Sequence, residues 1–83
     1  MKNDVDPIEE AFATALRVKR RELGISQEEL AHRAGVSMRY ISMLERNINQ
    51  PSLVKLNNIA KGLEITLVEF VQSIQDCLQP PTD

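Results

Sequence analysis

Apolar residues recur every three or four positions along most of the chain, which is the spacing of amphipathic helices. This pattern predicts five helices and no strand in 83 residues. The first helix runs from about Pro7 to Leu23, because proline and two glutamates suit a helix start and Gly24 suits the end. Its apolar face carries Phe12, Leu16 and Leu23.

The segment from Gln27 to Arg46 predicts two short helices joined by a tight turn. Ser26 caps the first helix, and Glu29 completes a capping box with it. Ser37 caps the second helix. Gly35 lies between them, because so short a turn needs a residue at positive φ. Small and aliphatic residues from both helices face the core: Leu30, Ala31, Ala34, Val36, Ile41 and Leu44.

The second helix of the pair, within residues 37–47, projects from the domain and can enter the major groove of DNA, which is about 12 Å wide. Residues 27–46 therefore predict a helix-turn-helix. A plain helical hairpin inside a bundle core is the alternative. The spacing of Ala31, Gly35 and Val36 favours the helix-turn-helix, because all three fall where the motif requires them.

Two more helices follow a polar loop that ends at Pro51. Ser52 caps the fourth helix, which stops near Gly62, and Thr66 with Glu69 makes a capping box for the fifth. The fourth helix carries apolar residues at helical spacing: Leu53, Leu56, Ile59, Ala60 and Leu63. We expect an all-α, compact five-helix bundle that forms one domain over residues 1–83, with its core at about 8–78.

The apolar stripe of the fifth helix is broader than a single core contact in so small a bundle requires. We expect part of it to form the seam of a homodimer. The residues expected in this seam are Leu67, Val68, Val71, Ile74, Cys77 and Leu78. The alternative places all of them in the core of one copy. A dimer buries more apolar surface, which a domain of this size needs.

Composition narrows the possible functions. Cys77 is the only cysteine, which excludes an internal disulfide, and the acidic N-terminal segment lacks the apolar stretch of a secretion signal. Both features indicate a cytoplasmic protein. No apolar run approaches the roughly 18 residues of a membrane span. His32 has no second ligand at metal spacing, and no catalytic set is visible, so we expect no metal, no cofactor and no enzyme.

The distribution of charge points to a nucleic acid. The net charge of −2 argues against such a partner at first. However, residues 17–50 carry seven bases against four acids, whereas both ends of the chain are acidic. Positive charge is therefore concentrated in and just before the helix pair, where binding to phosphates requires it. Charge alone would favour a solvated surface without a partner, and the helix-turn-helix motif overturns that interpretation.

At these residues the chain resembles the lambda-repressor-like, Xre/Cro-type family of bacterial and phage helix-turn-helix proteins. The resemblance covers roughly residues 12–70. Three runs support it: SQEELA from Ser26, YIS-x-LER from Tyr40 and PSL-x-x-L-x-x-IA from Pro51. It implies a five-helix bundle, most similar to short dimeric regulators such as restriction–modification controller proteins and small phage repressors. Asn47 replaces the family's usual glycine and tolerates the left-handed conformation.

The resemblance also assigns a pair of charged residues. Arg20, four residues before Gly24, and Glu45 match an arginine and a glutamate that pair in this family. Both lie near the apolar faces of their helices. The resemblance therefore implies a partly buried ion pair that ties the first helix to the third, rather than groups that read DNA.

A helical projection centred on Ile41 identifies the side chains that can reach base edges. Base contacts are expected from Met38, Arg39, Ser42 and Met43. Arg39 is the leading candidate, because a guanidinium can donate two hydrogen bonds to guanine. The alternatives are a phosphate contact and a solvated side chain. Met43 either packs on a thymine methyl group or is simply exposed.

Phosphate contacts are expected from the groups that flank this arc. They are Gln27, Ser37, Tyr40, Arg46, Asn47 and Asn49. Tyr40 has a second interpretation as an aromatic residue at the edge of the core. Together these features predict a transcriptional regulator that binds double-stranded DNA as a homodimer, with two recognition helices about 34 Å apart on a near-palindromic site. The alternative is a protein-interaction module of the same fold, such as an antitoxin that binds a partner protein.

Overall fold

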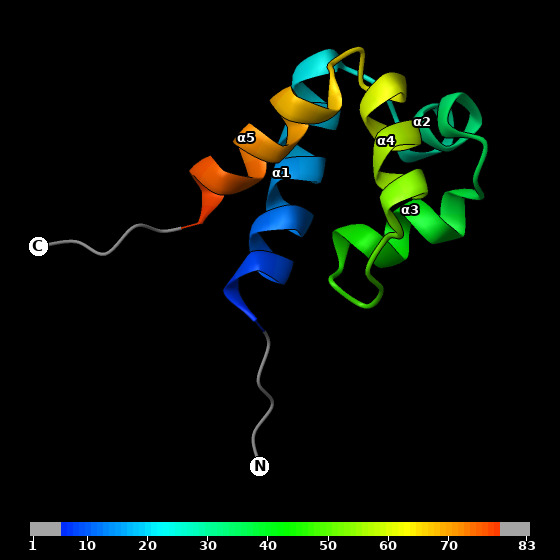
Figure 1. Ribbon diagram of the computed structural model, residues 1–83. Helices are drawn as coiled ribbons and strands as arrows, with labels where there is room; N and C mark the ends of the chain where they lie inside the picture. The colour runs from blue at the N-terminus through cyan, green and yellow to red at the C-terminus, as the bar shows by residue number, and fades with distance from the viewer. Residues whose placement is uncertain (1–5, 79–83) are drawn as a thin grey trace, which may run out of the picture.

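A computed structural model describes residues 6–78, which form five α-helices joined by short connections (Figure 1). The helices are α1 Pro7–Leu23, α2 Gln27–Ala34, α3 Met38–Glu45, α4 Leu53–Gly62 and α5 Leu67–Cys77. This confirms the all-α five-helix bundle. The third helix is shorter than residues 37–47, because Ser37 is its N-cap and Arg46 its C-cap. Among the described residues, no helix combines the length and apolar character that crossing a membrane requires.

The helices pack in two groups that share one core. α1 lies along α5, whereas α2 packs against both α3 and α4 (Figure 1). α1 also contacts α3, and α4 contacts α5, so the two groups are joined. The rings of Phe12 and Phe70 link α1 to α5, with centroids 6.0 Å apart and planes tilted by 50°. The largest fully buried side chains are Phe70, Leu16, Leu30, Ile41, Leu44 and Ile59.

Each helix starts on a side chain that accepts a hydrogen bond from an amide of the first turn. These caps are Asp6, Ser26, Ser37, Ser52 and Thr66. The capping box of Thr66 and Glu69 is complete, as predicted. The box predicted at Ser26 is only half formed, because the carboxylate of Glu29 accepts instead from Arg33 Nε at 3.0 Å.

Four helices end in the same pair of backbone hydrogen bonds, the Schellman arrangement, with one residue in the left-handed conformation. These residues are Gly24, Gly35, Asn47 and Glu64. Asn47, at φ 59°, adopts the conformation expected of it, whereas Glu64, at φ 65°, was not foreseen. The apolar residue that follows packs on the core in three of the four ends, but Ile48 is 56% exposed.

Gly62 is needed where α4 approaches α2. A Cβ atom added at Gly62 would lie 2.9 Å from Leu30 Cδ1 and 3.2 Å from Arg33 Cβ. Gly62 ends α4 near the predicted position, but the left-handed residue that turns the chain is Glu64. The close packing of α4 on α2 therefore depends on the absence of a side chain at this position.

Two apolar residues lie elsewhere than the sequence predicted. Ile74, expected in the dimer seam, is 7% exposed and belongs to the core of the single chain, because it follows Phe70 by one helical turn on the same face of α5. Leu53, placed in the apolar stripe of the fourth helix, is 72% exposed. Cys77 and Leu78 pack partly against the core.

Candidate nucleic-acid interface

The turn between α2 and α3 fixes the direction of α3. Gly35 adopts φ 72°, and the amide of Val36 donates to the carbonyl of Ala31 at 3.0 Å. Ser37 Oγ then accepts from the amide of Tyr40 at 3.0 Å and starts the new helix. Since Ile41 and Leu44 of α3 are fully buried, the opposite side of the helix must face outward.

The outward side of α3 carries no carboxylate. Met38 is 51% exposed, Arg39 is exposed, and Ser42 and Met43 are half-buried. The only acid of α3 is Glu45, which is buried. This surface therefore presents a guanidinium, a hydroxyl and two thioethers, which are groups that can approach base edges without repelling the phosphates.

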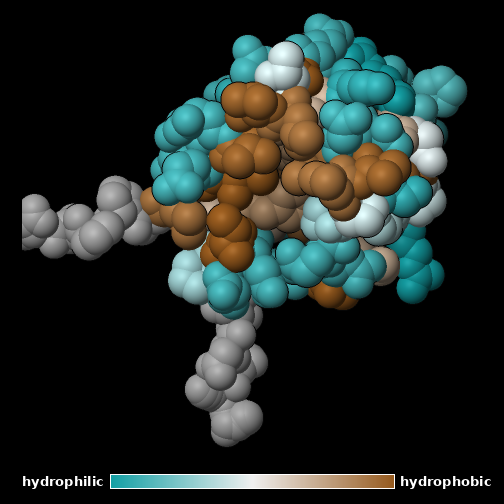
Figure 2. Space-filling model, in the orientation of Figure 1, coloured by the Kyte–Doolittle hydropathy of each residue, from teal (hydrophilic) through white to brown (hydrophobic). Residues whose placement is uncertain are grey.

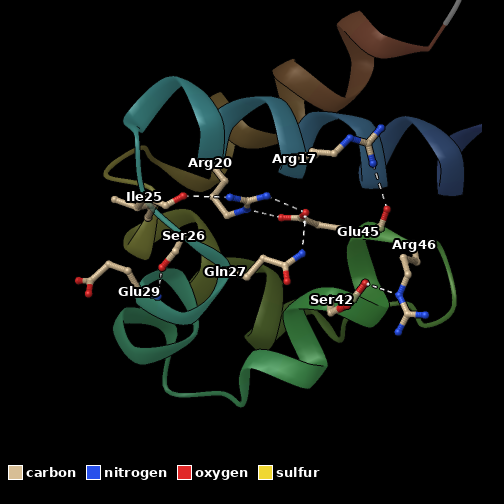
Figure 3. A network of polar contacts seen from close by, with 9 residues as sticks. All are labelled: Arg17, Arg20, Ile25, Ser26, Gln27, Glu29, Ser42, Glu45 and Arg46. Atoms are coloured by element: carbon tan, nitrogen blue, oxygen red, sulfur yellow. Dashed lines mark hydrogen bonds and ion pairs between the residues drawn. The ribbon is translucent and has the colours of Figure 1, made fainter.

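Arg20 and Glu45 form the ion pair that the family resemblance implies (Figure 3). Arg20 Nε donates to Glu45 Oε2, and Arg20 Nη2 donates to Oε1 at 3.0 Å. Arg20 Nη1 also donates to the backbone carbonyl of Ile25 at 2.9 Å. The two charged side chains are 11% and 4% exposed, so the pair is largely withdrawn from water and anchors the end of α3 to α1.

Two further side chains hold Glu45, and neither of these contacts was predicted. Gln27 Nε2 donates to Glu45 Oε1 at 3.0 Å, and Arg17 Nη1 donates to the Glu45 backbone carbonyl at 3.1 Å (Figure 3). Gln27, expected on a phosphate, thus has a partner within the protein, although a glutamine amide carries a second N–H. The sequence signal for Arg17 was its position three residues before Arg20, on the same side of α1.

This network sets the ionisation of the buried pair. Burial alone raises the pKa of Glu45, but hydrogen bonds from Arg20 and Gln27 and the charges of Arg20 and Arg17 outweigh it, and the net pKa is lowered. The hydrogen bond and charge of Glu45 raise the pKa of Arg20 despite its burial. Both groups are therefore charged at neutral pH.

The side chains expected on phosphates lie around the ends of α2 and α3. Arg46 is exposed, whereas Asn47 and Asn49 are half-buried. Tyr40 packs partly against the core, as its second interpretation held, and burial raises the pKa of its phenol. The phenol thus keeps its proton as a possible donor. A polar hollow at the corner of α1 and α3 is lined by Glu10, Ala13, Thr14, Arg17, Glu45, Arg46 and Asn47.

A second surface of the molecule is apolar. Figure 2 shows hydrophobic side chains gathered over α5 and the neighbouring part of α4. Val68 and Val71 of α5 are 78% and 47% exposed, and Leu53 and Val54 of α4 are 72% and 67% exposed. Leu67 borders a shallow hollow on α5 together with Val68 and Val71. Leu53 and Val54 were not foreseen as part of this surface, because helical spacing assigned Leu53 to the core.

The fold, the glycine turn and the acid-free outward helix together define a helix-turn-helix protein. A family model described as helix-turn-helix matches residues 16–70. The chain therefore belongs to this lambda-repressor-like family of transcriptional regulators, as the sequence predicted.

Individual relatives agree with this assignment. The HTH-type transcriptional regulator y4dJ of Sinorhizobium fredii is 42% identical over 52 residues, which cover 63% of this chain and 68% of the relative. An HTH-type transcriptional regulator of Methanothermobacter thermautotrophicus is 46% identical over 50 residues, covering 60% of this chain and 72% of the relative.

Solved structures share the whole fold. The restriction–modification controller protein C.Esp1396I, solved as a tetramer with its natural 35 base-pair operator, superposes with a TM-score of 0.84 at 28% identity, over 89% of this chain and 97% of that chain. The clp gene regulator ClgR of C. glutamicum superposes with a TM-score of 0.82 at 27% identity, over 94% and 100% of the two chains.

Proposed function

We propose that the protein is a sequence-specific DNA-binding regulator that reads its operator through the outward side of α3. The observation that carries this proposal is an exposed Arg39 on a helix that has no exposed acid and is fixed by the turn at Gly35. The likeness to a controller protein bound to its operator supports it. Base contacts come from Met38, Arg39, Ser42 and Met43.

Phosphate contacts flank these base contacts in the proposal. Gln27, Ser37, Tyr40, Arg46, Asn47 and Asn49 supply them. Arg17 is a further member of this group, because it lines the same polar hollow as Arg46. Such contacts orient the helix on the duplex but carry no sequence information. The contacts of Arg17 and Arg46 can be measured through salt, because each phosphate that a cationic side chain neutralises steepens the fall of affinity with salt concentration.

We infer that two copies bind together through the apolar surface of α4 and α5. Val68 and Leu53 are each more than 70% exposed, which is costly for apolar side chains in a monomer. Leu67 and Val71 border the same hollow on α5 as Val68. Cys77, which the sequence also placed in the seam, borders a different hollow between α1 and α5 together with Val18, so it does not belong to this surface. A two-fold axis through this surface gives two recognition helices on successive turns of the major groove, about 34 Å apart, and hence a near-palindromic operator.

Selection of bound duplexes from a random pool at a stated salt concentration tests the function. The expected result is enrichment of one near-palindromic sequence with half-sites about one helical turn apart. Enrichment of no sequence, together with binding that follows salt alone, would overturn the proposal. That result would favour the alternative of a module that binds a partner protein.

Sedimentation of the full chain at tens of micromolar tests the dimer. We expect the mass of two chains for the wild type and of one chain for Val68→Glu, because a buried charge is far more costly than an exposed one. Met38→Glu is the matched control, since Met38 is an exposed apolar residue of α3. It should remain dimeric in the absence of DNA. A monomeric wild type at these concentrations would contradict the inference.

A further inference from the structure

We propose that Met38 and Met43 recognise the methyl groups at C5 of pyrimidines, so that each operator half-site carries two such methyls close to the guanine bound by Arg39. This inference rests on the proposed function and specifies its ligand. It rests on three observations: the exposure of Met38 and partial exposure of Met43 on α3, the apolar methyl groups in the major groove, and the spacing of the residues along the helix.

Met38 is 51% exposed at the first position of α3, and Met43 is half-buried and about 140° further round the helix, so the two thioethers flank Arg39 and Ser42. Neither belongs to the apolar core cluster or to the partly buried residues packed against it. The stability of the bundle therefore does not explain two thioethers beside Arg39. A long, unbranched and polarizable side chain does fit a contact with a small apolar group, because it adapts its shape to it.

The major groove offers one apolar group, the C5 methyl of thymine; its other base-edge groups donate or accept hydrogen bonds. A thioether is at best a weak acceptor, so it leaves such groups without partners. Met38 or Met43 placed over cytosine gains no methyl contact, because C5 of cytosine carries only a hydrogen. Over a methyl group the same side chain gains apolar contact instead.

The spacing along α3 gives the order of the bases. Arg39 and Met43 are four residues apart, so they lie on one stripe and about 6 Å apart along the helix axis. With the helix along the groove, this distance spans about two base-pair steps of roughly 3.4 Å. Met38 precedes Arg39 and is rotated from it by about 100°. Because Met38 lies only about 1.5 Å from Arg39 along the axis, which is less than one base-pair step, its methyl falls at the guanine's own base pair or a neighbouring one. The two methyls therefore lie within about four base pairs of each other.

A consequence is that the protein responds to DNA methylation. The side chain recognises the methyl group and makes no hydrogen bond to the pyrimidine that carries it. A 5-methylcytosine therefore presents the same apolar feature as thymine at the same place in the groove. Methylated cytosine at either position should restore the contact that cytosine lacks.

The test uses the selected operator with deoxyuridine in place of each half-site thymine, one at a time, at constant salt. Each replacement removes one methyl group and nothing else. We expect one position sensitive to Met38 and another to Met43, each with about a fourfold loss of affinity for the wild type, which corresponds to about 0.8 kcal/mol. In Met38→Ala or Met43→Ala, the loss at the corresponding position should disappear, whereas Met43→Leu should retain it.

A second arm compares cytosine with 5-methylcytosine at the same positions. The wild type should bind the methylated duplex about fourfold more tightly, and the matching alanine variant should not distinguish the two. Two results would overturn the inference while leaving sequence-specific binding intact. One is that deoxyuridine causes no loss of affinity at any position; the other is that the loss is equal in the wild type and both alanine variants. Failure to select any operator would instead overturn the proposed function, and this inference with it.

Discussion

Replacement of Arg20 by alanine should destabilise the fold strongly, because it strands a buried carboxylate. The substitution removes two hydrogen bonds to Glu45 and one to the carbonyl of Ile25. The Glu45 side chain, 4% exposed, keeps only the donor of Gln27. Breaking a buried pair in this way costs about 3–5 kcal/mol. The remaining Gln27 contact places the expected loss near the lower end, at about 3 kcal/mol.

Thermal unfolding followed by circular dichroism measures this loss. In a domain of this size each kcal/mol shifts the midpoint by about 4–8 °C, so Arg20→Ala should unfold at least about 12 °C below the wild type. Both proteins must be compared at equal concentration, because dimerisation itself raises the midpoint. A total stability of about 5–15 kcal/mol leaves the variant folded at low temperature.

Arg33→Ala provides a matched control. Arg33 also makes three hydrogen bonds, to Glu29, Glu64 and the carbonyl of Gly62, but its side chain is 32% exposed. Ion pairs in contact with solvent contribute little to stability, so the midpoint should fall by only a few degrees. Equal effects of Arg20→Ala and Arg33→Ala would refute the claim that burial makes the Arg20 pair important.

Three other predictions concern stability. Gly62→Ala should lower the free energy of unfolding by about 1 kcal/mol, because the new methyl group meets Leu30, and this outweighs alanine's better helix propensity. Denaturant titration measures this change, and an increase in the free energy of unfolding would contradict the close packing. Asn47→Ala should cost about 1 kcal/mol, and Asn47→Gly nothing, since only alanine is strained at φ 59°. Folding lowers the pKa of Glu45, so the ionised carboxylate contributes its full stabilisation above about pH 4.5. This contribution is lost as the pH falls through the pKa of Glu45 in the folded protein. The difference in unfolding free energy between the wild type and Glu45→Gln should therefore shrink in acid. A constant advantage down to pH 3 would argue against the ionised pair.

Elements with redundant local signals could be predicted from the sequence. The start of α5 combines a capping box at Thr66 with an apolar stripe, and the end of α2 combines Gly35 with a following apolar residue. Each signal depends on residues within one or two helical turns, so it does not depend on how the rest of the chain packs. The left-handed turn at Glu64 lacks one of these signals, because no glycine or asparagine stands at that position.

The burial of individual residues was harder to predict, because periodicity identifies the apolar face of a helix but not which helix packs on that face. The apolar spacing of Leu53 is as regular as that of Ile59, yet only Ile59 lies under another helix. Ile74 shares the stripe of Val71, but α5 is rotated so that Ile74 packs inward. Gln27 likewise has the sequence context of a phosphate contact, and only the folded chain brings Glu45 within 3.0 Å of its amide.

The central claim is that Arg39 reads a base, and a comparison of two duplexes tests it most directly. Affinities for the selected operator and for an unrelated duplex are measured at constant salt with the wild type, Arg39→Ala and Lys61→Ala, an equal change of charge at an exposed residue of α4. We expect Arg39→Ala to weaken operator binding by about 1–3 kcal/mol and to reduce the preference for the operator, with Lys61→Ala close to wild type. A loss that is the same on both duplexes would mean that Arg39 contacts only phosphate, and an unchanged affinity would mean that α3 does not face the DNA.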